Sequence, residues 1–112
     1  MGMMQDSTAV AANSRSANVL AGLMEEFVSR PSVITLLATG SATGLRVTMI
    51  AGGAVVVDDQ AIGLQNRFPI PPDDLIHQFG LTGPQDRMIL TFRNPTGGAL
   101  TAFWRVDVSP VA

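Results

Sequence analysis

Three pairs of adjacent acidic residues are the side chains best suited to bind a cation: Glu25-Glu26, Asp58-Asp59 and Asp73-Asp74. Ca²⁺ prefers carboxylate oxygens and needs about six to eight oxygen ligands. Neither aspartate pair lies in a loop with DxDxDG spacing, and a turn or the start of a helix explains each pair without a metal. The sequence therefore favours no metal site, with Ca²⁺ as the alternative.

The single histidine, His77, offers little chemistry on its own, and the chain has no cysteine. A zinc centre needs several His or Cys ligands. A serine nucleophile needs a histidine base, commonly with a G-x-S-x-G turn, and that turn is missing. The neighbours Ile76 and Phe79 favour a partly buried structural imidazole. We therefore expect a protein that is not an enzyme, with no cofactor and no small-molecule substrate.

The composition is poor in charge. Of the 112 residues, 46% are hydrophobic and 14% are charged, against about 25% charged in a typical soluble domain. All seven basic residues are Arg and the net charge is −2, so no dense cationic stripe for nucleic acid is expected. A small domain with so few charges exposes apolar surface, which self-association or a partner would cover.

Two runs near the end of the chain, residues 86–94 and 100–109, alternate between apolar and polar residues around a Pro-Thr-Gly-Gly turn. This pattern predicts an antiparallel hairpin with one apolar face, which must pack on a second layer. Trp104 falls on the apolar face and is expected in the core. Phe103 falls on the opposite face, where an exposed ring would mark a contact surface.

Three earlier runs predict further strands: residues 32–39, 45–51 and 54–58. A five-residue loop separates the first two, and Gly52-Gly53, which suits a primed turn or a bulge, separates the second and third; both junctions are expected to be hairpins. The first run has little polar face and is expected to be covered on both sides. In the second, Arg46 and Thr48 stand on the polar face. Residues 62–68 can form another strand, and residues 72–80 a short helix or turn.

The start of the chain is expected to hold a polar arm, residues 1–15, followed by a helix over residues 16–29. Ser16 can cap this helix and Pro31 would end it. A competing assignment makes residues 26–29 a strand. No signal peptide is expected, and no apolar run approaches the ~20 residues of a membrane span, so a cytoplasmic location is expected unless the resemblance given below implies another. The apolar residues of the helix recur at three- and four-residue steps: Val19, Leu20, Leu23, Met24, Phe27 and Val28.

The sequence thus predicts one domain of the all-β class, an antiparallel β-sandwich of six to eight strands with a leading arm and helix, residues 16–112 forming the domain. This plan resembles the small single-domain structural subunits of bacteriophage and other virus particles, many of them jelly rolls. The resemblance implies a capsid, penton or decoration-type protein, located in the virion, whose partners are copies of itself or other virion structural proteins. The expected interface is the helical stripe (Val19, Leu20, Leu23, Met24, Phe27 and Val28) together with Arg46 and Phe103. A ligand-binding or glycan-binding β-sandwich module is the alternative.

Overall fold

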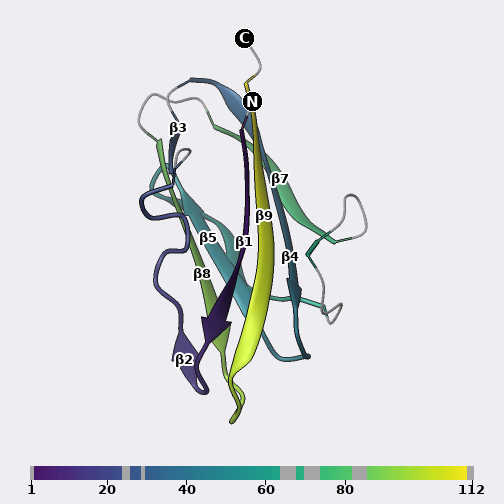
Figure 1. Cartoon of the computed structure of the whole chain (residues 1–112). Coiled ribbons are helices and arrows are strands. Elements are labelled where there is room, and N and C mark those ends of the chain that lie inside the picture. The colour runs from purple at the N-terminus through teal and green to yellow at the C-terminus, as the bar shows by residue number, and fades with distance from the viewer. Residues whose placement is uncertain are drawn as a thin grey trace.

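The chain folds into two antiparallel sheets packed face to face, as the computed structural model shows (Figure 1). The structure describes residues 2–23, 26–28, 30–63, 68–69, 74–81 and 86–110. Within these ranges it contains nine strands, two of them only two residues long, and no helix. The predicted all-β antiparallel sandwich is confirmed.

One sheet has four strands in the order β1-β9-β4-β7: β1 (Gly2–Val10), β9 (Leu100–Pro110), β4 (Ser32–Gly40) and β7 (Leu75–Leu81). The other is built on β8 (Asp86–Asn94), β5 (Arg46–Ala51) and β6 (Ala54–Ala61). Two short strands, β2 (Ser14–Arg15) and β3 (Phe27–Val28), pair with opposite ends of β8 along the edge that faces away from β5 (Figure 1).

The core lies between the sheets and follows the predicted alternation. Every second residue of β8 and β9 points inward and is buried: Met88, Leu90, Phe92, Ala102, Trp104, Val106 and Val108. Trp104 is a core residue, as predicted. Among the described residues its indole N–H is the one buried side-chain polar atom without a hydrogen-bond partner.

Two of the three predicted hairpins are wrong. β8 and β9 lie in different sheets, as do β4 and β5. Alternation shows which face of a strand is buried but not which strand it pairs with, and the loops 95–99 and 41–45 cross the ~10 Å between the sheets. The β5–β6 hairpin is confirmed: Gly52 and Gly53 have φ of +58° and +82°, the primed turn that glycine makes easily.

The arm and the helix are also corrected. Residues 2–10 form β1, paired with β9 along its whole length. Residues 16–23 and 26–28 contain no helix; they run along β8 as turns, and then as β3, close to the competing strand assignment. Polar side chains compete here with helical hydrogen bonds. The Asn18 side chain accepts the backbone N–H groups of Leu20 and Leu90 and donates to the carbonyl of Met88.

The segment after β6 differs from the prediction in part. Residues 62–63 lie outside any strand, and 64–67 lie outside the described residues. The turn or helix expected over 72–80 is instead β7 from Leu75 onward, hydrogen-bonded to β4; residues 72–73 are not described. Leu37 on β4 is fully buried although it faces away from the inter-sheet core, so this end of β4 is covered on both sides, as predicted.

Candidate functional site

Three arginines form a row across the outer face of the five-stranded sheet. In the strand register Arg15 of β2 lies opposite Arg93 of β8, and Arg93 lies opposite Arg46 of β5. Directly opposed residues of antiparallel strands point to the same face with Cβ atoms about 5 Å apart, and like charges in such pairs destabilise a sheet. We call these three residues the arginine row.

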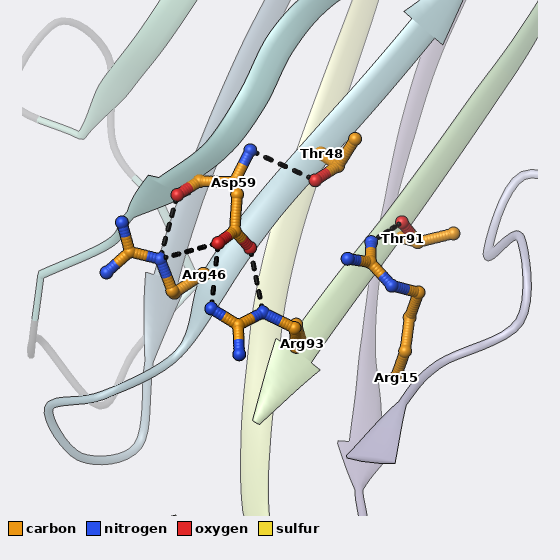
Figure 2. A network of polar contacts seen from close by, with 6 residues as sticks. All are labelled: Arg15, Arg46, Thr48, Asp59, Thr91 and Arg93. Atoms are coloured by element: carbon orange, nitrogen blue, oxygen red, sulfur yellow. Dashed lines mark hydrogen bonds and ion pairs between the residues drawn. The ribbon is translucent and has the colours of Figure 1, made fainter. Parts of the chain in front are cut away.

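One carboxylate, that of Asp59 on β6, joins two members of the row (Figure 2). Arg93 donates from Nε to Oδ1 at 2.9 Å and from Nη2 to Oδ2 at 2.7 Å, a two-pronged contact. Arg46 Nε lies 3.1 Å from Oδ2 and 2.8 Å from the Asp59 carbonyl oxygen. Asp59 has the left-handed φ of +49°, and its N–H donates to Thr48 Oγ1. The sheet therefore fixes this carboxylate between two guanidinium groups.

The contact shifts the proton affinity of both partners. The side-chain hydrogen bonds from Arg93 are the main reason that the pKa of Asp59 lies below its ordinary value; desolvation, the second-largest cause, acts in the opposite direction, and the nearby charges of Arg93 and Arg46 lower the pKa further. The hydrogen bond to Asp59 raises the pKa of Arg93 further. Both groups therefore stay charged across the physiological range.

Arg15, at the end of the row, has a neutral partner instead. Its Nη1 donates to Thr91 Oγ1 at 2.9 Å (Figure 2), and among the described residues it makes no ion pair. Beside it lies a surface pocket of about 370 Å³. The residues lining this pocket are Asn13, Ser14, Arg15, Arg93, Asn94 and Pro95.

Asn94 is one of the residues that line this pocket and is completely buried. Its side-chain nitrogen donates to the carbonyls of Val10 and Gly98, and its Oδ1 accepts from the N–H and hydroxyl of Thr96. These bonds tie the end of β8 to the end of β1 and to the β8–β9 loop. The pocket wall is therefore held in place by fully used hydrogen bonds.

The second notable surface is the open edge of β1. Strand β1 pairs on one side with β9, and on its other side no described strand pairs with it. Beside this edge Met3 is 57% exposed and Leu23 is 39% exposed, and both line a groove of about 270 Å³ with Met4, Gln5 and Asp6. Asp6 is the only charged residue of β1, and its carboxylate accepts the backbone N–H of Ser7.

The structure does not gather the predicted interface residues on one face. Leu20 and Val28 are core residues, Val19 packs against the core, and Met24 lies outside the described residues. Leu23 and Phe27 are exposed, with the Arg87 guanidinium above the Phe27 ring.

The two outward residues of that prediction lie on opposite sheets. Arg46 belongs to the arginine row on the five-stranded sheet. Phe103 is half-buried on the outer face of the four-stranded sheet, in edge-to-face contact with Phe68 at 5.3 Å.

Two members of the acidic pairs have ion-pair partners: Asp59, in the arginine row, and Glu26. Glu26 accepts the backbone N–H of Gly22 and pairs with Arg87 at 2.8 Å, and these two contacts, in that order, lower its pKa. Glu25 and Asp73 lie outside the described residues. No group of three or more His, Cys, Asp or Glu able to hold a metal occurs within the described ranges. His77 is exposed rather than partly buried, and stacks on Phe79.

Sequence reasoning placed Arg46 on a polar face but missed the row. Arg93 alternates with apolar residues in the same way, so its outward direction was readable. The residues opposite Arg93 on the neighbouring strands could not be predicted, because Arg15 and Arg46 lie far from it in sequence and no short-range pattern sets the strand register.

Comparison with known proteins gives no relative. No protein-family model, curated protein or solved structure matches the chain. Within the described part of the chain, no helix has the length and apolar character to cross a membrane.

Proposed function

We propose that this protein is a non-enzymatic structural subunit that associates with a second copy of itself through the open edge of β1, and that its sandwich is a jelly roll. The observation that carries the proposal is the β1 edge. It offers nine residues of regular strand with a single charge and with exposed Met3 and Leu23 beside it.

The strand order supports the jelly roll. If β2 and β3 are counted as one interrupted strand, the sheets read β1-β9-β4-β7 and β2/β3-β8-β5-β6. All consecutive strands alternate between sheets except β5 and β6. Eight strands connected in this way form two Greek keys, the arrangement of jelly rolls, which include many viral capsid domains and lectins.

The β1 edge carries one of the usual devices that stop strands from pairing between molecules, the charge of Asp6, which lies opposite the core residue Trp104 and so is on the inner face, and it lacks the others. The others include bulges, lysine, proline and short length. Strand β1 has an unbroken register with β9 and contains neither lysine nor proline. By contrast, β6 and β7, which are edge strands at the far ends of the two sheets, each have a register irregularity against their partner. A second copy of β1 is therefore the occupant that this edge fits.

A two-fold axis through Ser7 gives the most favourable pairing. Antiparallel β1 strands related by this axis place Asp6 of one copy opposite Thr8 of the other, and Met4 opposite Val10. An axis through Asp6 would place two carboxylates opposite each other, which is destabilising. The Ser7 register also continues the inner face of one sheet into the next.

The specific form that we propose is a capsid, penton or decoration-type protein of a virus particle. Subunits of a closed lattice bury the same self-complementary patch many times, which suits a chain with 14% charged residues. The ligand-binding alternative has support of its own in the arginine row, taken up below.

A single cysteine tests the proposed pairing, because the natural chain has none. In the Ser7→Cys variant two thiols meet at the axis, where opposed Cα atoms are about 4.5–5.5 Å apart, within the range of a disulfide. We expect a covalent dimer under mild oxidation. The matched control is Ser109→Cys, on the same outer face of the same sheet but on the interior strand β9, which should stay unlinked.

Native mass spectrometry provides the second readout. The natural chain should be dimeric or larger at micromolar concentration, Ser7→Lys should be monomeric because two lysines meet at the axis, and Ser109→Lys should behave as the natural chain does. A monomeric natural chain, or equal crosslinking of the two cysteine variants, would show the proposal to be wrong.

A further inference from the structure

We propose that the arginine row and its neighbouring pocket bind a tetrahedral dianion, the phosphate or sulfate group of a small ligand. This inference goes beyond the proposed function and does not depend on self-association, because the row lies on the five-stranded sheet and β1 belongs to the other.

The charges of the site are unbalanced in favour of an anion. The row contributes three guanidinium groups and the site contributes one carboxylate, that of Asp59, so two positive charges remain in a protein whose net charge is −2. Three arginines in direct cross-strand register repel one another. A doubly charged anion beside Arg15 and Arg93 would relieve the repulsion that Asp59 leaves.

The free donors have the right chemistry. Asp59 uses Nε and Nη2 of Arg93, and Thr91 uses Nη1 of Arg15; the second terminal nitrogen of each guanidinium has no partner among the described residues. Arginine presents its donors in a planar fork that matches the oxygens of phosphate and sulfate. Because Asp59 and Thr91 already orient the two side chains, binding requires little further ordering.

The pocket gives this anion a place and leaves room for more. Its volume of about 370 Å³ lies at the lower end of small-molecule sites, which range over about 300–1,000 Å³. Asn13 and Ser14 also line the pocket and add polar side chains to it. The site therefore suits an ester of phosphoric or sulfuric acid with a small polar group, such as a sugar.

Isothermal titration calorimetry at constant ionic strength, in chloride buffer, tests the proposal with four probes: inorganic phosphate, inorganic sulfate, glucose 6-phosphate and glucose 6-sulfate. We expect saturable binding of these anions with one site per chain. Tighter binding of the esters than of the inorganic ions identifies an ester as the ligand; equal binding identifies the free ion.

Two variants with opposite expected effects make the test specific. Arg15→Gln keeps the fold, since this side chain is exposed and bonds only to Thr91, and should weaken binding about tenfold or more, as the loss of a hydrogen bond to a charged group commonly does. Asp59→Asn removes the competing negative charge but keeps one amide oxygen that can accept from Arg93 and orient it, so this variant should tighten binding. The matched control Arg30→Gln removes one exposed positive charge next to β4, away from the row.

Backbone amide NMR shifts of the natural chain locate the bound ion and do not require any variant to fold. The largest changes on titration with phosphate should fall on residues 13–15 and 91–95. Absence of saturable binding, shifts elsewhere on the molecule, or equal weakening by Arg15→Gln and Arg30→Gln would overturn the proposal.

Discussion

At the scale of single residues, two carboxylates form ion pairs with arginines that are distant from them in sequence. Asp59 holds Arg46 and Arg93 on neighbouring strands, and Glu26 joins Arg87 of β8 to the backbone of Gly22. Both have a lowered pKa, Asp59 through Arg93 first and Glu26 through the Gly22 N–H first. Each therefore acts as a charged clamp that exists only while the carboxylate is ionised.

Acid should release both clamps. Because each pKa is lower in the folded chain than in the unfolded one, the stabilisation is complete above the unfolded values, about pH 4, and is lost as the pH falls through the folded values. We expect the urea midpoint to drop between about pH 5 and pH 2.5. The double variant Glu26→Gln/Asp59→Asn should flatten this drop, whereas Asp58→Asn, an exposed neighbour on β6, should leave it unchanged. An equal slope in all three proteins would contradict the role assigned to these carboxylates.

At the scale of elements, residues 14–23 and 26–28 close the outer edge of β8 with side chains as well as backbone. The Ser16 hydroxyl accepts the N–H of Phe92, and the Asn18 amide oxygen accepts the N–H of Leu90 at 3.0 Å. Between the two short strands β2 and β3, these side chains take the place of a paired strand. The backbone N–H and C=O groups along this edge of β8 are thus kept from pairing with other chains.

Asn18→Ala should open this edge. The change leaves the N–H groups of Leu90 and Leu20 without their acceptor, and we expect a loss of about 2 kcal/mol in the free energy of unfolding. Asn18→Asp keeps the accepting oxygen and loses only the long 3.4 Å bond to the Met88 carbonyl, so it should cost clearly less. Urea denaturation gives the stability, and hydrogen exchange of the Leu90 amide reports the edge directly. Equal losses in the two variants would contradict this account.

The buried faces of the strands and one hairpin turn could be predicted from the sequence, because residue alternation and turn residues determine them. The pairing between strands could not, because it depends on long-range register. The alternation in residues 86–94 and 100–109 correctly predicted the buried face, including Trp104, and Gly52-Gly53 correctly predicted the hairpin turn. The pairing of β8 with β9 was wrong, because a five-residue loop can join strands of one sheet or of two. The 16–29 helix was wrong because Leu20 and Val28 mimic a helical period while Ser16 and Asn18 bond to β8. For the same reason Arg46 was found and the arginine row was not.

At the scale of the whole molecule, nearly all pairing joins strands that are distant in the chain. The first long strand, β1, pairs with the last, β9, with Gly2 opposite Val108, and the ends of the two strands lie together at one end of the sandwich (Figure 1). Only β5 and β6 pair with a neighbour in sequence. A cut in the chain therefore separates no pair of directly connected, hydrogen-bonded strands, except at the β5–β6 turn.

Two circular permutants test this. A short Gly/Ser linker can join β9 to β1, with new ends either between Thr43 and Gly44, in an exposed turn, or between Gly52 and Gly53. The first should fold with stability close to that of the natural chain. In the second permutant β5 and β6 are no longer joined by a short turn, so bringing them together costs more chain entropy. We expect it to refold more slowly, as stopped-flow fluorescence of Trp104 would show. Faster refolding of the second permutant would contradict the importance of this turn.

The pairing of β1 with β9 has a consequence for how the protein is made. Among the described strands β1 emerges from the ribosome first and its partner β9 emerges last, so β1 stays without its partner until all the other described strands have been made. The same applies to the edge of β4 that pairs with β9. Only the β5–β6 hairpin can close early. The four-stranded sheet therefore cannot be completed before β9 has emerged, and until then the edge of β1 that β9 covers in the folded protein has no partner in this sheet.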